Sequence, residues 1–392
     1  MTNNHEHLDT TAITAGRNGG RGLSADISTS TVWSSSGLEQ THDEIVRGRR
    51  GRAYSRYTNP TVRQFEEAIA ELEGAEDALA FASGMGAIAS VVFALCSPGD
   101  HIVAQRQLYG GTLALLAGPV QRMGINVTFV DATKPGAFVE AASKPRTMLV
   151  IAETPANPSL ALADLDEVGS IGAPFTLVDS TFATPMGQQP LKHGVNISLH
   201  SATKAIGGHN DALIGVIAAD ADLIDAIWGY SVLHGAAASP YDAHNALRGI
   251  RTLAVRQERQ CASAMTLAEW FAGTPAVSAV HYPGLASHPQ HGLANKQMTN
   301  FGSMLAIELD GGAAACGKFL ESLQLARPAT SLGGPETLVC HPASSTHFGL
   351  DPESLASSAA ADGLLRISVG LENAQDLIAD FNRALPGSRS RS

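Results

Sequence analysis

Short apolar segments alternate with helix-length segments over residues 61–220. Near the start of this region Phe65, Ile69 and Leu72 recur at helical spacing, with glutamates on the other faces and Gly74 as a helix-ending residue. Seven short apolar runs follow, at 78–82, 102–104, 127–130, 148–152, 175–178, 197–199 and 213–218. Strands separated by helices predict βαβ units and a mostly parallel sheet.

The pattern changes on either side of this region. A helical stretch runs to about residue 272, and the later segments 301–309 and 364–369 alternate like antiparallel strands. Residues 1–60 have no clear period. We therefore expect an N-terminal arm (1–60), an α/β domain (61–250) and a smaller α+β C-terminal domain (251–392).

A basic cluster lies within the arm, at Arg47, Arg49, Arg50 and Arg52. Interleaved glycines favour a solvated loop, and an anion-binding loop is the alternative.

Composition narrows the class of protein. The chain has 392 residues, 44% of them hydrophobic and 16% charged, which is typical of a globular protein, and its formal net charge of −11 disfavours nucleic acid as a partner. It contains no apolar run of about 18 residues and no secretory signal, so no membrane span is expected. The four cysteines are far apart, which favours free thiols in a reducing cytoplasm.

A glycine-rich turn follows the first predicted strand. Gly84-x-Gly86-x-x-Ala89 fits a dinucleotide-binding fingerprint, and its backbone amides could hold a phosphate at a helix N-terminus. The expected acid about 20 residues later would be Asp100, but Asp100 lies in a turn before the next strand. A nicotinamide-dependent oxidoreductase is therefore a weak interpretation, and a purely structural turn is another alternative.

Two later segments favour a different cofactor. The apolar run 175–178 ends at Asp179, and the run 197–199 leads to Ser201, Thr203 and Lys204. A lysine among small apolar residues has a lowered pKa and suits Schiff-base chemistry, and the hydroxyls suit a phosphate. With a strand-end acid to pair with a pyridine nitrogen, these are the parts of a pyridoxal phosphate (PLP) site. The histidines show no metal-binding pattern, so no metal site is expected.

The sequence resembles the Cys/Met-metabolism family of PLP enzymes over about residues 54–383. The family includes cystathionine γ-synthase, cystathionine γ-lyase, methionine γ-lyase and O-acetylhomoserine sulfhydrylase. The motifs that carry the resemblance lie in order at 54–61, 83–85, 108–112, 153–158, 178–182, 200–204, 239–242, 331–334 and 365–372. The resemblance implies PLP-dependent transferase fold type I (aspartate aminotransferase-like), with the smaller α+β domain at the C-terminus. It also implies γ-elimination or γ-replacement on an amino acid.

The resemblance also implies roles for individual residues. Lys204 would bind PLP covalently and move protons, Asp179 would hold the pyridine N–H, and Tyr109 would stack on the ring and act as an acid/base. Arg366 would bind the substrate carboxylate, near Asn157 and Ser331. The remaining cofactor-binding residues would be Gly84, Met85, Thr181, Ser201 and Thr203, together with Tyr54 and Arg56 from a neighbouring subunit. An obligate dimer with shared active sites, and further a homotetramer, is therefore expected.

Three positions differ from named members of the family. Methionine γ-lyases usually carry a cysteine where this chain has Gly111. The cystathionine enzymes commonly carry a glutamate where it has Thr330, and animal cystathionine γ-lyases an arginine where it has Ala114. A small, uncharged distal pocket would leave the far charges of cystathionine unpaired, at a cost of about 1–3 kcal/mol each. We therefore expect methionine, homocysteine or an activated homoserine ester as substrate.

Overall fold

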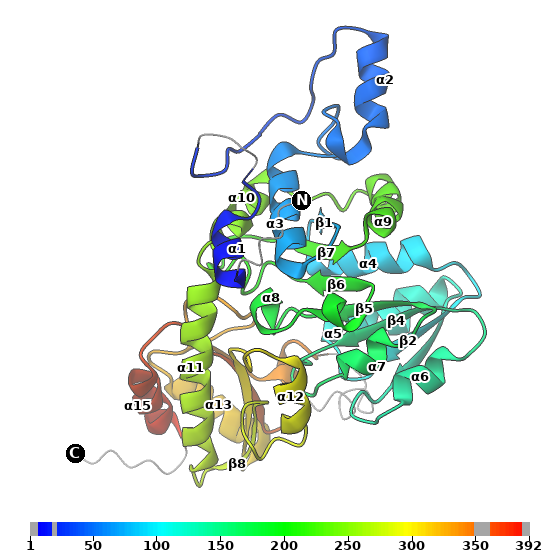
Figure 1. The fold of residues 1–392 in the computed structure, drawn as a ribbon. Helices are drawn as coiled ribbons and strands as arrows, with labels where there is room; N and C mark the ends of the chain where they lie inside the picture. Colours follow the sequence, from blue (N-terminus) through cyan, green and yellow to red (C-terminus); the bar gives the residue numbers. More distant parts are fainter. Residues whose placement is uncertain (1–6, 18–21, 349–360, 386–392) are drawn as a thin grey trace.

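The structure, a computed structural model, describes residues 7–17, 22–348 and 361–385. Two sheets, each with its own helices, form the body, and part of the N-terminal region projects from it (Figure 1). No helix within these ranges is long and apolar enough to cross a membrane.

All seven strands predicted in the first 220 residues form one sheet, in the order β1-β7-β6-β5-β4-β2-β3. Six of them run in one direction, and β7 is antiparallel to both of its neighbours. The prediction of a mostly parallel sheet is thus confirmed. The strands are β1 (Asp77–Phe81), β2 (His101–Gln105), β3 (Asn126–Val130), β4 (Thr147–Glu153), β5 (Phe175–Asp179), β6 (Ile197–His200) and β7 (Gly215–Ala219).

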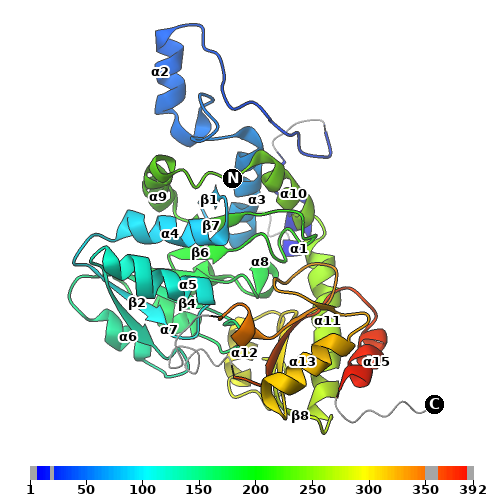
Figure 2. The same ribbon diagram turned by 180° about the vertical axis from the view of Figure 1, so that it is seen from behind.

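Helices cover both faces of this sheet because successive strand residues point to opposite sides. In β1, Leu79 and Phe81 face the core on the side of α4 and α9, whereas Ala78 and Ala80 face the core beneath α3 and α10 (Figures 1 and 2). The helices of this part are α3 (Pro60–Glu73), α4 (Gly84–Leu95), α5 (Gly110–Leu115), α6 (Ala137–Ala142), α7 (Leu165–Gly169), α8 (Thr184–Gly187), α9 (Ala221–His234) and α10 (Pro240–Ile250).

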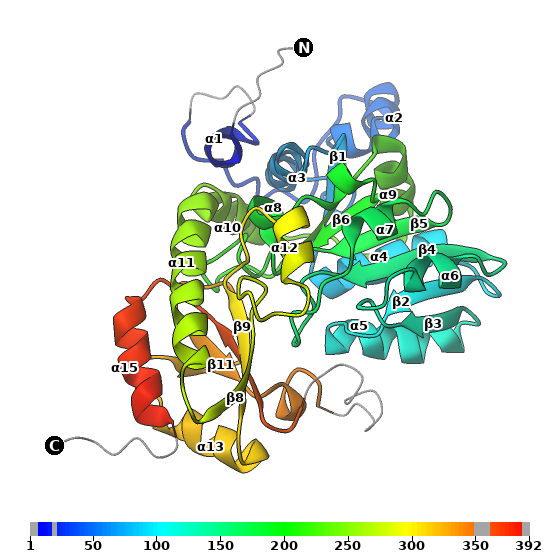
Figure 3. The same ribbon diagram turned by 60° about the horizontal axis from the view of Figure 1, so that its bottom comes forward.

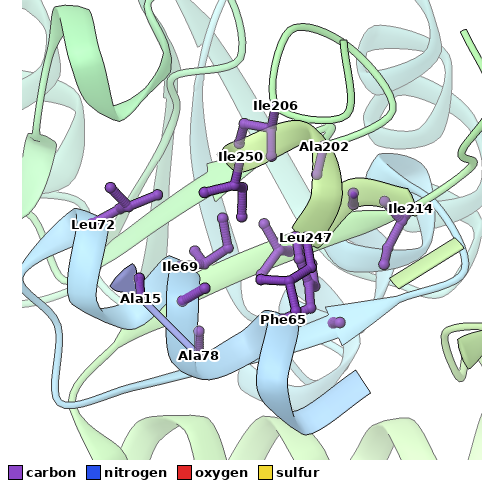
Figure 4. Packing of buried hydrophobic residues seen from close by; sticks show 14 of the residues in the cluster. Ala15, Phe65, Ile69, Leu72, Ala78, Ala202, Ile206, Ile214, Leu247 and Ile250 are labelled. Atoms are coloured by element: carbon purple, nitrogen blue, oxygen red, sulfur yellow. The ribbon is translucent and has the colours of Figure 1, made fainter. Parts of the chain in front are cut away.

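Helix α3 shows how local sequence sets an element that supports the rest. Asn59 caps it by accepting a hydrogen bond from the Thr61 amide at 3.0 Å, Pro60 opens it, and Gly74 ends it at a φ of 69°. Its apolar stripe packs against α10 and against Ala202 and Ile206, which flank the lysine loop (Figure 4). The core under α3 therefore holds the backbone around Lys204.

The second sheet has the order β10-β11-β12-β9-β8 and is mostly antiparallel, with β10 and β11 parallel to each other. Helices α11, α13 and α15 pack on one of its faces (Figure 3). Its strands are β8 (Val277–His281), β9 (Met304–Leu309), β10 (Arg327–Pro328), β11 (Leu338–Cys340) and β12 (Leu364–Ser368). Its helices are α11 (Leu253–Ala272), α12 (His291–Gln297), α13 (Gly312–Ser322) and α15 (Ala374–Ala384). The boundary expected near residue 250 falls between α10 and α11 and stays a prediction.

The arm is more regular than its sequence suggests. It contains α1 (Leu8–Thr14) and α2 (Leu38–Val46), and α2 has no buried residue. The prediction that the whole basic cluster lies in a solvated loop is wrong for Arg49, which is only 6% exposed. The other three arginines, Arg47, Arg50 and Arg52, are exposed. The Arg49 guanidinium binds the carboxylates of Glu66 and Asp77, which compensates its burial.

Candidate active site

A cavity of about 450 Å³ opens where the carboxyl ends of β4, β5 and β6 face the second sheet. In open α/β sheets ligands bind at this edge. Of the thirteen residues predicted from the sequence, eleven line the cavity: Gly84, Met85, Tyr109, Asn157, Asp179, Thr181, Ser201, Thr203, Lys204, Ser331 and Arg366. Tyr54 and Arg56 are not among the lining residues.

Lys204 lies in the loop after β6. Its Nζ donates a hydrogen bond to Ser331 Oγ at 2.9 Å, so the amine points across the cavity towards the second sheet. Burial lowers the pKa of Lys204, and the positive charge of Arg366 lowers it further. A lysine in this state has more of the neutral amine that a nucleophile or proton acceptor needs.

Two carboxyl groups, one buried and one half-buried, lie side by side at the strand ends. Asp179 ends β5 and Glu153 ends β4, and the two residues are register partners in the sheet. Burial raises the pKa of Asp179, although hydrogen bonds from the Thr181 hydroxyl and amide oppose this shift. Burial, and then the charge of Asp179, raise the pKa of Glu153 well above its usual value. The pair would be stabilised by a cation in the cavity.

The glycine-rich turn forms the N-terminus of α4. Ser83 caps the helix by accepting the Gly86 amide at 3.0 Å, and the first amides of a helix have no partner within it. A Cβ on Gly84 would lie 3.0 Å from the Ser201 Cβ, so glycine allows the turn to approach the loop after β6. This edge offers backbone amides and a serine hydroxyl to an anion.

The Thr203 hydroxyl, predicted from the sequence to bind a phosphate, forms two hydrogen bonds with the backbone of its own chain. It donates to the Ile214 carbonyl at 3.2 Å and accepts the Ile214 amide at 2.9 Å. Rotation of the hydroxyl is needed before it can donate to a ligand.

Arg366 is a buried arginine in the middle of β12, 2% exposed. Its neighbours Leu365 and Ile367 belong to the core under the helices, so strand alternation directs Arg366 to the opposite face. Its Nη1 donates to Asn157 Oδ1 and its Nη2 to the Ser331 carbonyl, both at 2.9 Å. Ser331 has a φ of 75°, which is rare for a residue other than glycine and is typical of functional sites.

Tyr109 immediately precedes α5 and is 39% exposed. Its amide donates to Glu153 Oε2 at 2.8 Å. A Cβ on Gly111 would lie 2.6 Å from Tyr109 Cε1, so the absence of a side chain there leaves space for the ring. Thr330 lines the cavity as expected, whereas Ala114 is exposed and is not among the lining residues.

Tyr54 and Arg56 lie together in the arm. The Arg56 guanidinium sits 5.3 Å from the Tyr54 ring centre and 5.1 Å from that of Tyr57, and it donates to the Val232 carbonyl. The structure therefore does not bring these two residues to the cavity of their own chain.

Sequence reasoning assigned no role to several lining residues, among them Glu153, Thr112 and Thr346. Glu153 carries the same signal as Asp179, an acid that ends an apolar strand. Asp100 instead binds Arg146 at 2.8 Å and is not among the lining residues. Within the described ranges, no group of three or more His, Cys, Asp or Glu side chains could hold a metal ion.

Comparison with known proteins connects this geometry to a family. The family model described as Cys/Met metabolism PLP-dependent enzyme matches residues 9–386. An L-methionine gamma-lyase of Porphyromonas gingivalis is 45% identical, over 86% of this chain and 85% of its own length. An O-succinylhomoserine sulfhydrylase of Pseudomonas aeruginosa is 42% identical, over 86% of this chain and 84% of its own length.

A solved structure supports the same assignment. Cystathionine gamma synthase from Xanthomonas oryzae pv. oryzae, in complex with aminoacrylate and cysteine, matches with a TM-score of 0.91 and 37% identity, over 97% of this chain and 98% of that one. The predicted PLP-dependent transferase fold is thus confirmed, and PLP is the cofactor on which the family depends. The chain belongs to the family of PLP-dependent enzymes of cysteine and methionine metabolism.

Proposed function

We propose that this enzyme eliminates the γ-substituent of a sulfur amino acid such as methionine or homocysteine. One observation carries the proposal: of the four charged residues that line the cavity in the described parts of the chain, Asp179, Lys204 and Arg366 match charged groups of a cofactor and an amino acid, while Glu153 accepts two backbone amides of the chain itself. The other described residues that line the cavity, including Thr330, Leu213 and Thr346, are uncharged. A short thioether fits such a lining without leaving a charge unpaired.

The residues of the cavity fit PLP. Asp179 is a half-buried carboxyl whose pKa is raised by desolvation, and the positive charge of a protonated pyridine nitrogen would stabilise its anion. The turn at Gly84 and Met85, with Ser201 and, after rotation, Thr203, offers donors to the phosphate. Thr181 orients Asp179 through two hydrogen bonds, at 2.9 and 2.5 Å. Lys204 is positioned to bind the cofactor covalently.

When bound, the cofactor withdraws electrons from the substrate α-carbon and so acidifies its proton. The chain supplies the remaining functions. Arg366 binds the α-carboxylate through its guanidinium, which Asn157 holds in place by accepting a hydrogen bond from Nη1. The Lys204 amine removes the α-proton, and its lowered pKa favours that role. Lys204, once it has released the α-proton, accepts the β-proton, and the electron pair left on the β-carbon expels the γ-sulfur. The Tyr109 hydroxyl protonates the departing sulfur.

A γ-replacement enzyme is the second candidate. The similarity to an O-succinylhomoserine sulfhydrylase and to a cystathionine gamma synthase favours it. Both candidates share the steps up to loss of the γ-substituent. They differ in whether a thiol or water then reacts, so the geometry of the charged groups supports both.

The arm supports a further proposal about assembly. Tyr54 and Arg56 lie outside the cavity of their own chain, and α2 buries none of its residues. We propose that the arm completes the site of a second copy, where Arg56 binds the cofactor phosphate, in a dimer or a tetramer of two such dimers. The free thiols Cys96, Cys261, Cys316 and Cys340 are consistent with a cytoplasmic location, which we also propose.

Product analysis tests the function directly. Purified enzyme is supplied with methionine, homocysteine, O-acetylhomoserine or cystathionine, with and without an added thiol, and 2-oxobutyrate and new thioethers are measured. We expect 2-oxobutyrate from methionine or homocysteine. Thioether formation from the homoserine ester as the main reaction would favour γ-replacement. Turnover of cystathionine much faster than of both methionine and the homoserine ester would contradict the uncharged distal pocket.

A further inference from the structure

Glu153 stands at the centre of the hydrogen-bond network of the cavity. It is buried, and each of its two carboxylate oxygens accepts one backbone amide. Oε2 accepts the Tyr109 amide at 2.8 Å, and Oε1 accepts the Asn157 amide at 2.7 Å. Its own amide donates to Gln105 Oε1 at 3.0 Å, so the strand end that carries it is also held.

The network continues from Asn157 to the groups that face the substrate. Asn157 Oδ1 accepts Arg366 Nη1, and Arg366 Nη2 donates to the carbonyl of Ser331. The Ser331 hydroxyl accepts the Lys204 amine. Hydrogen bonds to the backbone and side chains of Asn157 and Ser331 therefore connect Glu153 to the arginine and the lysine, while its other oxygen holds the residue that carries the Tyr109 ring.

We propose that Glu153 is a positioning residue that sets the Asn157–Arg366 pair and Tyr109 at a fixed separation across the substrate. This inference rests on the proposed function, because it needs an α-carboxylate as the ligand of Arg366. A carboxylate suits the task because it has acceptors on both oxygens and no donor. The two backbone amides and the positive charge of Arg366 favour the Glu153 anion, although burial and Asp179 outweigh them and raise the pKa of Glu153.

The substitution Glu153→Gln tests whether Glu153 positions these groups or only stabilises the fold. Glutamine has the same shape, but its amide nitrogen cannot accept a hydrogen bond, so either Tyr109 or Asn157 loses its acceptor. The control is Glu73→Gln, which alters a buried carboxylate on α3 that binds His200 Nε2 at 2.6 Å and does not line the cavity. Both changes disturb a buried acid, and only the first touches the network.

The measurement is equilibrium titration of the bound cofactor's visible absorbance with norvaline and with butylamine. These ligands differ in the α-carboxylate, and neither has a γ-leaving group. We expect the preference of the wild-type enzyme for norvaline to shrink about tenfold in Glu153→Gln, since the arginine is no longer held in position. In Glu73→Gln we expect the preference for norvaline over butylamine to change less than about twofold.

An unchanged preference in Glu153→Gln, or an equal loss in both variants, would overturn the inference. If Glu153→Gln does not retain the cofactor, Glu153→Asp is titrated instead. It keeps the charge but is one methylene shorter, so the same loss of preference is expected, and an unchanged preference overturns the inference. A wild-type enzyme with no visible absorbance, or with no preference for norvaline, would instead contradict the proposed function itself.

Discussion

At the scale of single residues, Gly111 is the position where an absent side chain matters most. The ring of Tyr109 occupies the space that a Cβ at this position would need. In Gly111→Ala the ring edge must retreat by roughly 1 Å, and displacement of that size at a reacting group can cost up to about 10² in rate. We expect kcat/KM to fall about tenfold.

The stability of Gly111→Ala should change little, because the ring is the movable end of a half-exposed side chain and alanine favours a helix. Thermal unfolding and steady-state kinetics check both parts. Gly118→Ala is the matched control: its Cβ would meet only the end of the Arg122 side chain, at 4.0 Å. A tenfold loss in the control as well would show that the ring is not the cause.

At the scale of elements, a largely buried cluster of charges joins the arm to the body. Arg49 and Arg63 both bind Glu66 and Asp77, at 2.6 to 3.0 Å. Arg49 comes from the short helical turn Gly48–Arg50, Glu66 from α3 and Asp77 from β1. The cluster therefore ties three elements together at the base of the arm.

Arg49→Met should destabilise the enzyme by about 3–5 kcal/mol, because it leaves buried carboxylates with less compensation. Arg50→Met, one residue further along and exposed, should change the free energy of unfolding by less than about 0.5 kcal/mol. Urea unfolding followed by circular dichroism measures both. Equal effects in the two variants would refute the structural role of the cluster.

At the scale of the whole molecule, the proposed exchange of arms makes activity depend on which subunits are paired. Arg56→Ala and Lys204→Ala should each be inactive or nearly so. In a mixed dimer with shared sites, one site carries both changes and the other carries neither. Refolding the two variants together at equal amounts should restore about a quarter of wild-type activity.

Assays of 2-oxo acid formation before and after mixing provide the measurement. Activity no higher than the sum of the separate variants would mean that Arg56 does not act across subunits. Mixing Lys204→Ala with Asp179→Ala is the control, since both residues belong to the same cavity and no mixed site is intact.

Much of this molecule could be predicted from its sequence because the relevant signals are local. The period of apolar residues marked all seven strands of the large sheet, and Gly74 marked the end of α3. Helix α2 was missed, because it has only three apolar residues, Leu38, Ile45 and Val46, which are too few to show a helical period. The reversed direction of β7 was missed as well, because strand direction depends on pairing and not on composition.

By itself, the sequence determined the alternation of strands and helices, the family motifs and the chemical types of the cavity residues, because these depend on neighbours along the chain. Only the tertiary structure decided which residues of the same type are buried and paired and which are exposed. Arg49 is buried against two acids while Arg50 is exposed, and Glu153 joins Tyr109 to Asn157 across a gap of about 50 residues. Burial and hydrogen-bond partners come from distant segments, and they determine the charge and position of each group.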